Sequence, residues 1–446
     1  MSGAAPHRPG AWLARARASL AEIDGLRFRG RVVRAAGLGL EVLGVPAQVG
    51  EIFEIERMDG SGSMLAEAVG FRDGRALLLP LEDTSGIGSA SRVEPLGRSL
   101  DIVWSPRLLG RVLDGLGRPI DGRGPLPEGA RMSVRRDPPP ALRRRMIEKP
   151  LPTGVSAIDA LLTFGRGQRV GVLAGPGIGK STLMGKIARD AQADVVVVCL
   201  VGERGREVRQ FLELSLGEHG LARAVVVAAT SDTPPLQRFA APLVATTIAE
   251  CFRDEGRDVL LLMDSATRFA AAVREIGLAA GEPPTTKGYP PSLYAHLPRL
   301  VERLGTAERG SITSVITVLV EGDDLADPVA DAMMSLLDGH VVLSRELARR
   351  NHYPAIDVLT SVSRTMGQVV EREHARLAAR FNELWSAYTE AADLLRIGAY
   401  RPGGDPVLDA AVQSRDAMLR LLRQPSRETR SFEQTLALLA EAVGSA

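Results

Sequence analysis

The fold of this chain is decided by the stretch Arg169-Val-Gly-Val-Leu-Ala-Gly-Pro-Gly-Ile-Gly-Lys-Ser-Thr-Leu-Met-Gly-Lys-Ile-Ala-Arg189. Its first six residues, ending at Ala174, are mostly apolar and predict a buried strand, whereas the residues from Ser181 onward predict a helix. Between the strand and the helix lies a glycine-rich loop that ends in Lys180. This order of strand, loop and helix is the setting in which such a loop binds phosphate.

The chemistry of the loop follows from its residue types. Its glycines let backbone N–H groups surround a phosphate, and the helix N-terminus adds the positive end of a dipole. Lys180 is placed to neutralise the terminal phosphates and the Ser181 hydroxyl to ligate Mg²⁺. Ala174 stands where the strict motif has glycine, a replacement that the looser motif tolerates. The predicted nucleotide-binding residues are Ala174, Gly175, Pro176, Gly177, Ile178, Gly179, Lys180, Ser181 and Thr182.

Around this loop, apolar runs alternate with helical patterns. Near-continuous apolar runs are typical of parallel strands that are buried on both faces of a sheet. The predicted strands are 168–174, 193–201, 224–229, 258–264 and 311–320. After about Val369 these runs stop, and 371–395 and 406–422 are predicted helices separated by Pro402-Gly-Gly. The sequence therefore predicts an α/β protein with a central parallel sheet and a C-terminal helical domain, 370–446.

The N-terminal third of the chain has a different pattern of apolar and turn-forming residues. Residues 26–96 contain short β-type runs between glycine and aspartate turns, which predict a small barrel or sandwich. Residues 1–25 form a predicted helical leader, either a frayed end or a helix that docks on a partner or membrane surface. Residues 131–154 are a basic, proline-rich connector, a pattern typical of a solvated linker, with a binding site as the alternative.

Composition limits the function further. A chain of 446 residues exceeds what one core usually serves, so two or three domains are expected. The formal charge of +1 argues against a surface built throughout to bind nucleic acid. Cys199 and Cys251 have no metal-site spacing and fit a reducing compartment. With neither a membrane-spanning apolar run nor a signal-peptide pattern, the protein is expected in the cytosol.

Two acidic residues complete a candidate hydrolytic site. Asp264 ends a predicted buried strand, at the sheet edge where ligands bind, and is expected to join Ser181 in the Mg²⁺ shell, partly through water. Glu203 follows another strand at the same edge and is the candidate to orient or deprotonate the attacking water. The alternative is that Glu203 only pairs with Arg204 or Arg206.

Other segments carry a resemblance that extends over nearly the whole chain. With the phosphate-binding loop, they resemble the catalytic subunits of rotary ATPases and, more closely, the ATPases of type III protein export. Residues 282–292 and the 321–324 element are typical of the export ATPases. The segments are Thr153-Gly-Val-Ser-Ala-Ile-Asp159, Gly202-Glu-Arg-Gly-Arg-Glu-Val208, Leu262-Met-Asp-Ser-Ala-Thr-Arg-Phe269, 274–285, Gly288-Tyr-Pro-Pro-Ser292, Glu321-Gly-Asp-Asp324, His352-Tyr-Pro-Ala-Ile-Asp357 and Ser361-Val-Ser-Arg364.

The resemblance assigns roles to individual residues. Glu203 matches the family's catalytic glutamate, and Arg364 matches an arginine finger that reaches the nucleotide of a neighbouring subunit. Tyr353 falls where the family stacks an aromatic ring on adenine. Arg204 and Arg268 lie within the matching segments and are further candidate site residues. The family also implies a RecA-like ATPase domain, 97–369, between the β-barrel and the helical domain.

The function that the resemblance implies is hydrolysis of ATP by a homohexamer that energises type III protein export. It would use ATP and Mg²⁺, release chaperones, unfold cargo, and meet stalk and regulator proteins peripherally at the inner membrane, without binding nucleic acid. Ile397-Gly-Ala-Tyr with Gly404-Asp-Pro favours the flagellar branch, although 351–358 together with 277–284 also occurs in the injectisome branch. The competing classes are a ring RNA translocase resembling transcription termination factor and a non-catalytic rotary-ATPase subunit, which typically lacks the glutamate seen at 203.

Overall fold

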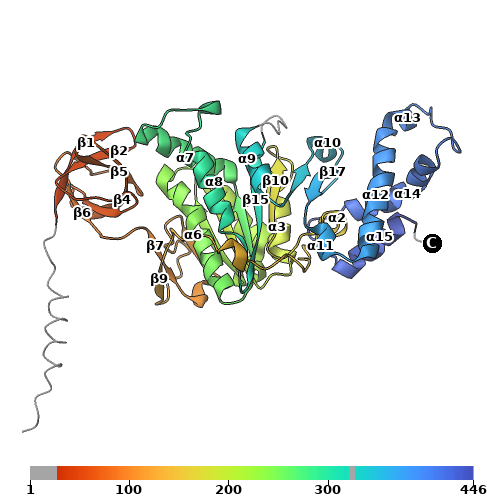
Figure 1. Ribbon diagram of the computed structural model, residues 1–446, viewed down its shortest axis with the longest axis horizontal. Helices are drawn as coiled ribbons and strands as arrows, with labels where there is room; N and C mark the ends of the chain where they lie inside the picture. The colour runs from red at the N-terminus through yellow and green to blue at the C-terminus, as the bar shows by residue number, and fades with distance from the viewer. Residues whose placement is uncertain (1–27, 321–326, 445–446) are drawn as a thin grey trace, which may run out of the picture. The chain divides into compact units, whose positions relative to one another are not determined.

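The computed structural model describes residues 28–320 and 327–444, and the chain divides into two compact units between Arg98 and Ser99 (Figure 1). The predicted leader, 1–25, and the 321–324 element lie outside the described residues.

The first unit is a closed, antiparallel barrel. The order around it is β1-β2-β5-β4-β3-β6, and β6 returns to pair with β1. Phe53, Ile55, Leu78 and Val93 are fully buried inside it. Of the two expected architectures, barrel and sandwich, the chain adopts the barrel. Its strands are β1 (Gly30–Ala36), β2 (Gly39–Leu43), β3 (Ile52–Glu56), β4 (Ser63–Arg72), β5 (Arg75–Pro80) and β6 (Arg92–Pro95).

The second unit is built on a sheet in the order β17-β16-β10-β15-β13-β11-β12-β8, with β14 at the side of β15. All of these pairs are parallel except β16–β17 and β14–β15. The five predicted strands all form, within two residues of their expected ends. The strands are β8 (Val112–Asp114), β10 (Arg169–Ala174), β11 (Val195–Val201), β12 (Ala224–Ala229), β13 (Asp258–Asp264), β14 (Gly305–Thr306), β15 (Ser311–Leu319), β16 (Gly339–Leu343) and β17 (Ile356–Ser363), and a separate pair joins β7 (Asp101–Trp104) to β9 (Ala130–Ser133).

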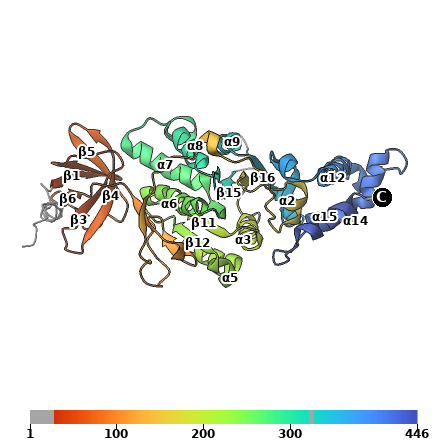
Figure 2. The same cartoon turned by 60° about the horizontal axis from the view of Figure 1, so that its bottom comes forward.

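Helices cover both faces of the sheet. The chain moves one way along the sheet from β10 through β11 to β12 and then reverses, so right-handed crossovers place the two groups of helices on opposite faces. Figure 2 shows α3 and α5 on one side of the strands and α6, α7 and α8 on the other. These helices are α3 (Lys180–Asp190), α4 (Gly205–Gln210), α5 (Gly217–Ala222), α6 (Pro235–Asp254), α7 (Ala266–Ala280), α8 (Leu293–Glu302) and α9 (Pro328–Leu336).

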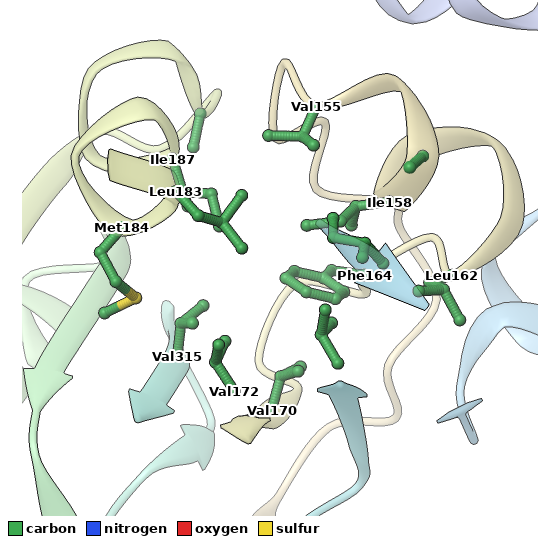
Figure 3. Close-up of a cluster of buried hydrophobic side chains, with 14 of the residues drawn as sticks. Val155, Ile158, Leu162, Phe164, Val170, Val172, Leu183, Met184, Ile187 and Val315 are labelled. Atoms are coloured by element: carbon green, nitrogen blue, oxygen red, sulfur yellow. The ribbon is translucent and has the colours of Figure 1, made fainter. Parts of the chain in front are cut away.

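Helix α3, which begins in the glycine-rich loop, is anchored in the core. Leu183, Met184 and Ile187 point from α3 toward Val172 of β10 and Val315 of β15 (Figure 3), and all five are buried. Burial of each such side chain contributes about 1.5–3 kcal/mol. This packing fixes the helix and therefore the position of Lys180 at its first residue.

The C-terminal helices pack on one another and on α2 (Ser156–Leu161). Their apolar faces share a core with α2 that includes Phe381, Met418 and Leu439. The helix expected over 371–395 breaks at Ala391 into two, and the helix 406–422 forms as predicted. The C-terminal helices are α12 (Arg372–Glu390), α13 (Ala392–Arg396), α14 (Pro406–Leu422) and α15 (Phe432–Ala442). Two short helices, α10 (Arg345–Arg349) and α11 (Met366–Val369), precede them.

The expectation that the connector, 131–154, is a solvated linker is wrong for part of it. Arg144 donates to the backbone carbonyl of Leu304 at 2.8 Å, and Arg145 donates to that of Gly310 at 3.0 Å. These guanidinium groups bind backbone carbonyls in loops of the sheet. The first residues of the connector belong to β9. The connector is therefore folded onto the second unit.

The turn before α2 depends on one buried carboxylate. Asp159 accepts hydrogen bonds from the Thr153 amide at 2.8 Å, the Thr153 hydroxyl at 2.7 Å and the Gly154 amide at 2.9 Å. Burial raises the pKa of Asp159 to about 6.

We expect Asp159→Ala to lower the free energy of unfolding by roughly 2–5 kcal/mol, because three buried donors lose their acceptor. The shift of the urea midpoint at pH 8 measures this loss. Asp159→Asn, which keeps one oxygen, is the control and should lose less. An Asp159→Ala midpoint within error of the parent would contradict this account.

Candidate nucleotide-hydrolysing site

The glycine-rich loop leaves β10 at Ala174 and turns directly into α3. Gly177 and Gly179 have φ values of +77° and +94°, a region that side chains rarely allow. The Gly179 carbonyl accepts the Leu183 amide at 3.0 Å, which begins the helix. The first amides of a helix have no partner within it, so this geometry leaves them for a bound anion.

Three charged side chains meet beside the loop. Lys180 forms an ion pair with the Asp264 carboxylate, and its Nζ lies 3.7 Å from Glu203 Oε1. They meet because β11 and β13 are parallel neighbours, with Leu200 opposite Asp264, so the two acidic residues follow strands that end at one sheet edge. All three side chains are at most 16% exposed. The structure thus brings together the predicted lysine and the two predicted carboxylates.

Glu203 sits where its charged form is disfavoured. Burial raises its pKa to about 7; a hydrogen bond with the Glu207 carboxyl and the nearby charge of Asp264 act in the same direction, and Lys180 opposes them. The same hydrogen bond lowers the pKa of Glu207. A carboxylate with a pKa near neutrality is suited to accept a proton from water. Arg204 and Arg206, the two alternative partners of Glu203, are both exposed.

Two residues of this cluster were not predicted from the sequence. Thr317, in β15, donates its hydroxyl to Asp264 Oδ1 at 2.8 Å and so orients the carboxylate. Glu207 is the hydrogen-bonding partner of Glu203. The available signals are a polar residue inside a largely apolar strand for Thr317 and, for Glu207, its place in the segment 202–208 that carries the family resemblance.

Arg204 and Arg268 frame the Glu203 loop rather than entering the cluster, and both are exposed. The Arg204 amide donates to the Glu207 carboxylate at 3.4 Å, at the start of α4. A Cβ built on Gly202 would lie 3.1 Å from the side chain of Arg268, so this arginine packs over the residue that precedes Glu203.

A cavity of about 590 Å³ adjoins the loop. The Tyr353 ring lies against Gly179 and is 43% exposed, so one aromatic face is open to a flat ligand. Gln424 was not predicted; its amide donates to the Gly154 carbonyl and accepts from the Ser156 amide, both at 3.0 Å. The cavity is lined both by the loop and α3 and by two segments that are distant in sequence. Its lining includes Ile178, Gly179, Thr182, Tyr353, Pro354 and Pro425.

Arg364 lies away from this cluster. Because β17 runs antiparallel to β16, Ser363 pairs with Gly339, and the Arg364 amide donates to the Asp338 carbonyl at 3.0 Å. The Asp338 amide in turn donates to Arg169, the first residue of β10. The length of β10 therefore separates the Arg364 backbone from the loop, about 16–20 Å at about 3.3 Å per residue. Arg364 is exposed, and it lies at the end of the sheet where β10 begins, opposite to the end that carries the phosphate-binding loop.

Family models match three consecutive parts of the chain: the beta-barrel domain of the ATP synthase alpha/beta family at 32–97, its nucleotide-binding domain at 154–363, and the T3SS EscN ATPase C-terminal domain at 370–441. A type 3 secretion system ATPase of Xanthomonas euvesicatoria is 50% identical over 420 residues, covering 94% of this chain and 95% of that protein. The chain belongs to the type III export ATPases of the ATP synthase alpha/beta family. The predicted family is thereby confirmed, and with it the enzyme class, an ATPase.

Other members of the family give the same result. The flagellum-specific ATP synthase of Pseudomonas aeruginosa is 50% identical over 417 residues, 92% of each chain. The assembled ATPase EscN from the enteropathogenic E. coli type III secretion system matches with a TM-score of 0.88 and 43% identity, over 93% of this chain and all of that one. The predicted fold of barrel, RecA-like domain and helical domain is confirmed. Relatives from both export systems are equally similar, so the flagellar assignment stays a prediction.

In the described part of the chain, no helix has the length and apolarity that a membrane crossing requires.

Proposed function

We propose that this export ATPase works as a homohexameric ring in which Arg364 of one subunit completes the catalytic site of the next. The observation that carries the proposal is the separation within one chain: Lys180, Glu203 and Asp264 gather at the loop, whereas Arg364 lies at the opposite sheet edge. An arginine supplied by a neighbour stabilises charge on the transferring phosphoryl group and ties hydrolysis to assembly. The assembled state of the relative EscN supports the ring.

The roles of the site residues follow from their positions. The loop amides and Lys180 hold the phosphates of ATP, and Lys180 exchanges its Asp264 partner for phosphate oxygens. Glu203 orients a water and takes its proton as the water oxygen bonds to the γ-phosphorus. The bond to the bridging oxygen breaks, which yields ADP and phosphate. Once Glu203 has taken the proton, it donates a hydrogen bond to the Glu207 carboxylate, which stabilises the protonated form.

The donors beside the loop fit Mg²⁺. Ser181 is exposed on the first turn of α3, and Asp264 ends β13. A hydroxyl and a carboxylate are hard oxygen donors, and Mg²⁺ typically takes one or two such ligands together with phosphate oxygens and water. Bound there, Mg²⁺ neutralises charge on the phosphates. Ser181 and Asp264 are the residues that would hold it, in part through water.

The wider role is export. A second EscN structure is in complex with its central stalk EscO, and we extend such a stalk partner to this chain. Regulator proteins, chaperones released from cargo, cargo unfolding and peripheral association with the inner membrane belong to the same proposal. We favour the flagellar branch on the 397–406 segment. Copurification of rod or hook proteins from the native organism supports it, and copurification of secreted effectors overturns it.

The competing RNA translocase requires aromatic side chains that stack on bases. Phe53 is fully buried in the barrel, whereas Phe28 and Phe71 are exposed, and residues 28–96 contain no tyrosine or tryptophan.

Two measurements on one preparation test the proposed function. ATP turnover per subunit should rise with protein concentration as rings form, followed by light scattering, and poly(C) should leave it unchanged within twofold. Turnover that is independent of assembly would overturn the ring, and a many-fold stimulation by poly(C) would overturn the export role.

We expect Tyr353→Ala to raise the KM for ATP by about tenfold, because a stacked base loses roughly 1–1.5 kcal/mol of contact. Stacking acts on the base and not on the atoms that react, so kcat should change little. Steady-state kinetics measure both values. Tyr353→Phe is the matched control and should keep the parental KM; an equal loss in both variants would show that the hydroxyl, not stacking, is responsible.

A further inference from the structure

A second cavity lies where the basic connector meets the helices on one face of the ATPase domain. Its volume is about 420 Å³, and it shares no lining residue with the nucleotide cavity. The connector contributes Arg135 and Arg136, and α8 contributes His296 and Arg299. The part of the connector that does not brace the sheet loops thus forms one wall of this cavity.

The floor of this second cavity is apolar and aromatic. Phe239 of α6 stacks on Phe269 of α7 with ring centroids 5.4 Å apart. The His296 ring meets Phe239 edge-on at 5.0 Å. Leu300, also in the lining, is buried. A flat or aliphatic group can therefore be buried here without the loss of a polar contact.

Two of the lining arginines, Arg303 and Arg136, bind carboxylates that do not line the cavity. Arg303 is buried and binds Glu250 through two bonds of 2.9 and 2.8 Å. Arg136 binds Asp254 at 3.0 Å. These pairs build the wall and keep its shape.

The charged side chains at the surface of the cavity are two arginines and one carboxylate. Arg299 on α8 is exposed, and so are Arg135 and Asp137 on the connector. Burial lowers the pKa of His296, and the charges of Arg299 and Arg135 lower it further, while Glu282 opposes them only in part. The field at the ring is therefore positive, and the neutral imidazole can donate or accept a hydrogen bond.

We propose that this second cavity binds a small organic anion, with a phosphate or carboxylate group at Arg299 and His296 and its apolar part on the Phe239 floor. The planar guanidinium fork matches both oxyanions, and burial of the attached group supplies the remaining affinity. The cavity shares no lining residue with the cavity beside the phosphate-binding loop.

Calorimetry with phenyl phosphate tests this site in the full-length protein, with the nucleotide site first filled by ADP whose own binding is measured separately. We expect saturable binding to the parent, weakening by about tenfold in Arg299→Gln, and weaker binding of inorganic phosphate, which has no apolar part. Arg309→Gln, an exposed arginine outside the lining, is the control and should bind as the parent does. Benzoate in place of phenyl phosphate shows which oxyanion is preferred.

Arg299 is exposed, so its replacement should leave the fold intact, and parental ATP turnover in both variants checks this. His296→Gln provides a second variant from the same wall. Failure of phenyl phosphate to bind the ADP-filled parent would overturn the proposal. So would equal binding by Arg299→Gln and the parent, or inorganic phosphate binding as tightly as phenyl phosphate.

Discussion

Glu203→Gln is expected to reduce kcat of the assembled ATPase by about 10²–10⁴-fold, with nucleotide affinity changed by less than about threefold. The amide keeps the size of the side chain but cannot take a proton from water. Single-turnover hydrolysis and fluorescent-nucleotide binding separate the two effects. Glu218→Gln, an exposed glutamate on α5, is the control and should keep parental turnover. Retained turnover in Glu203→Gln would remove the catalytic assignment and favour a role in ion pairing alone.

The same glutamate predicts a pH dependence. The active form is the carboxylate, and the pKa of Glu203 is raised to about 7, so kcat/KM should fall as the pH drops below about 7. The hydrogen bond that protonated Glu203 donates to the Glu207 carboxylate is one cause of the raised pKa, so Glu207→Gln should move this acid limb of the pH profile to lower pH. An acid limb at the same pH in parent and Glu207→Gln would show that the carboxyl pair does not set it.

Arg364→Ala is expected to lower kcat of the ring by about 10³–10⁵-fold, the usual contribution of an arginine finger. ATP binding should persist, because the loop and Lys180 lie at the other end of β10. Ring formation, measured by light scattering, should also persist. Arg364→Lys keeps the charge but loses the planar fork and should recover only part of the rate. Arg309→Ala, exposed and also near the starts of the strands, is the matched control.

The elements predicted correctly are those whose sequence carries a strong local pattern. The five long apolar strands and the helix 406–422 are of this kind. Strand β8 has three residues, too few to show a period, and it forms because it adds to the edge at β12. Helix α15 went unpredicted although its start carries a capping box at Ser431. The barrel closes through the β1–β6 pairing, which only long-range contact can reveal.

The residues of the candidate site likewise fall into those that the local sequence predicts and those that it does not. Lys180, Glu203 and Asp264 are predictable because each follows or begins an element whose end is fixed by sheet topology. Thr317 and Gln424 are not, since their partners lie 53 and 268 residues away, at Asp264 and Ser156. The connector was misjudged because proline and arginine indicate solvation locally, whereas the carbonyls that Arg144 and Arg145 bind belong to distant loops.

The claim that each site is shared between two subunits is tested most directly by mixing two inactive variants. Lys180→Ala subunits lack a working phosphate loop but keep the finger, and Arg364→Ala subunits have the reverse defect. In mixed rings, an intact loop faces an intact finger in about a quarter of sites, the product of one half and one half, so about a quarter of parental turnover should return. The shared site would be contradicted by mixed rings that are shown to contain both variants and yet are as inactive as rings made of either variant alone.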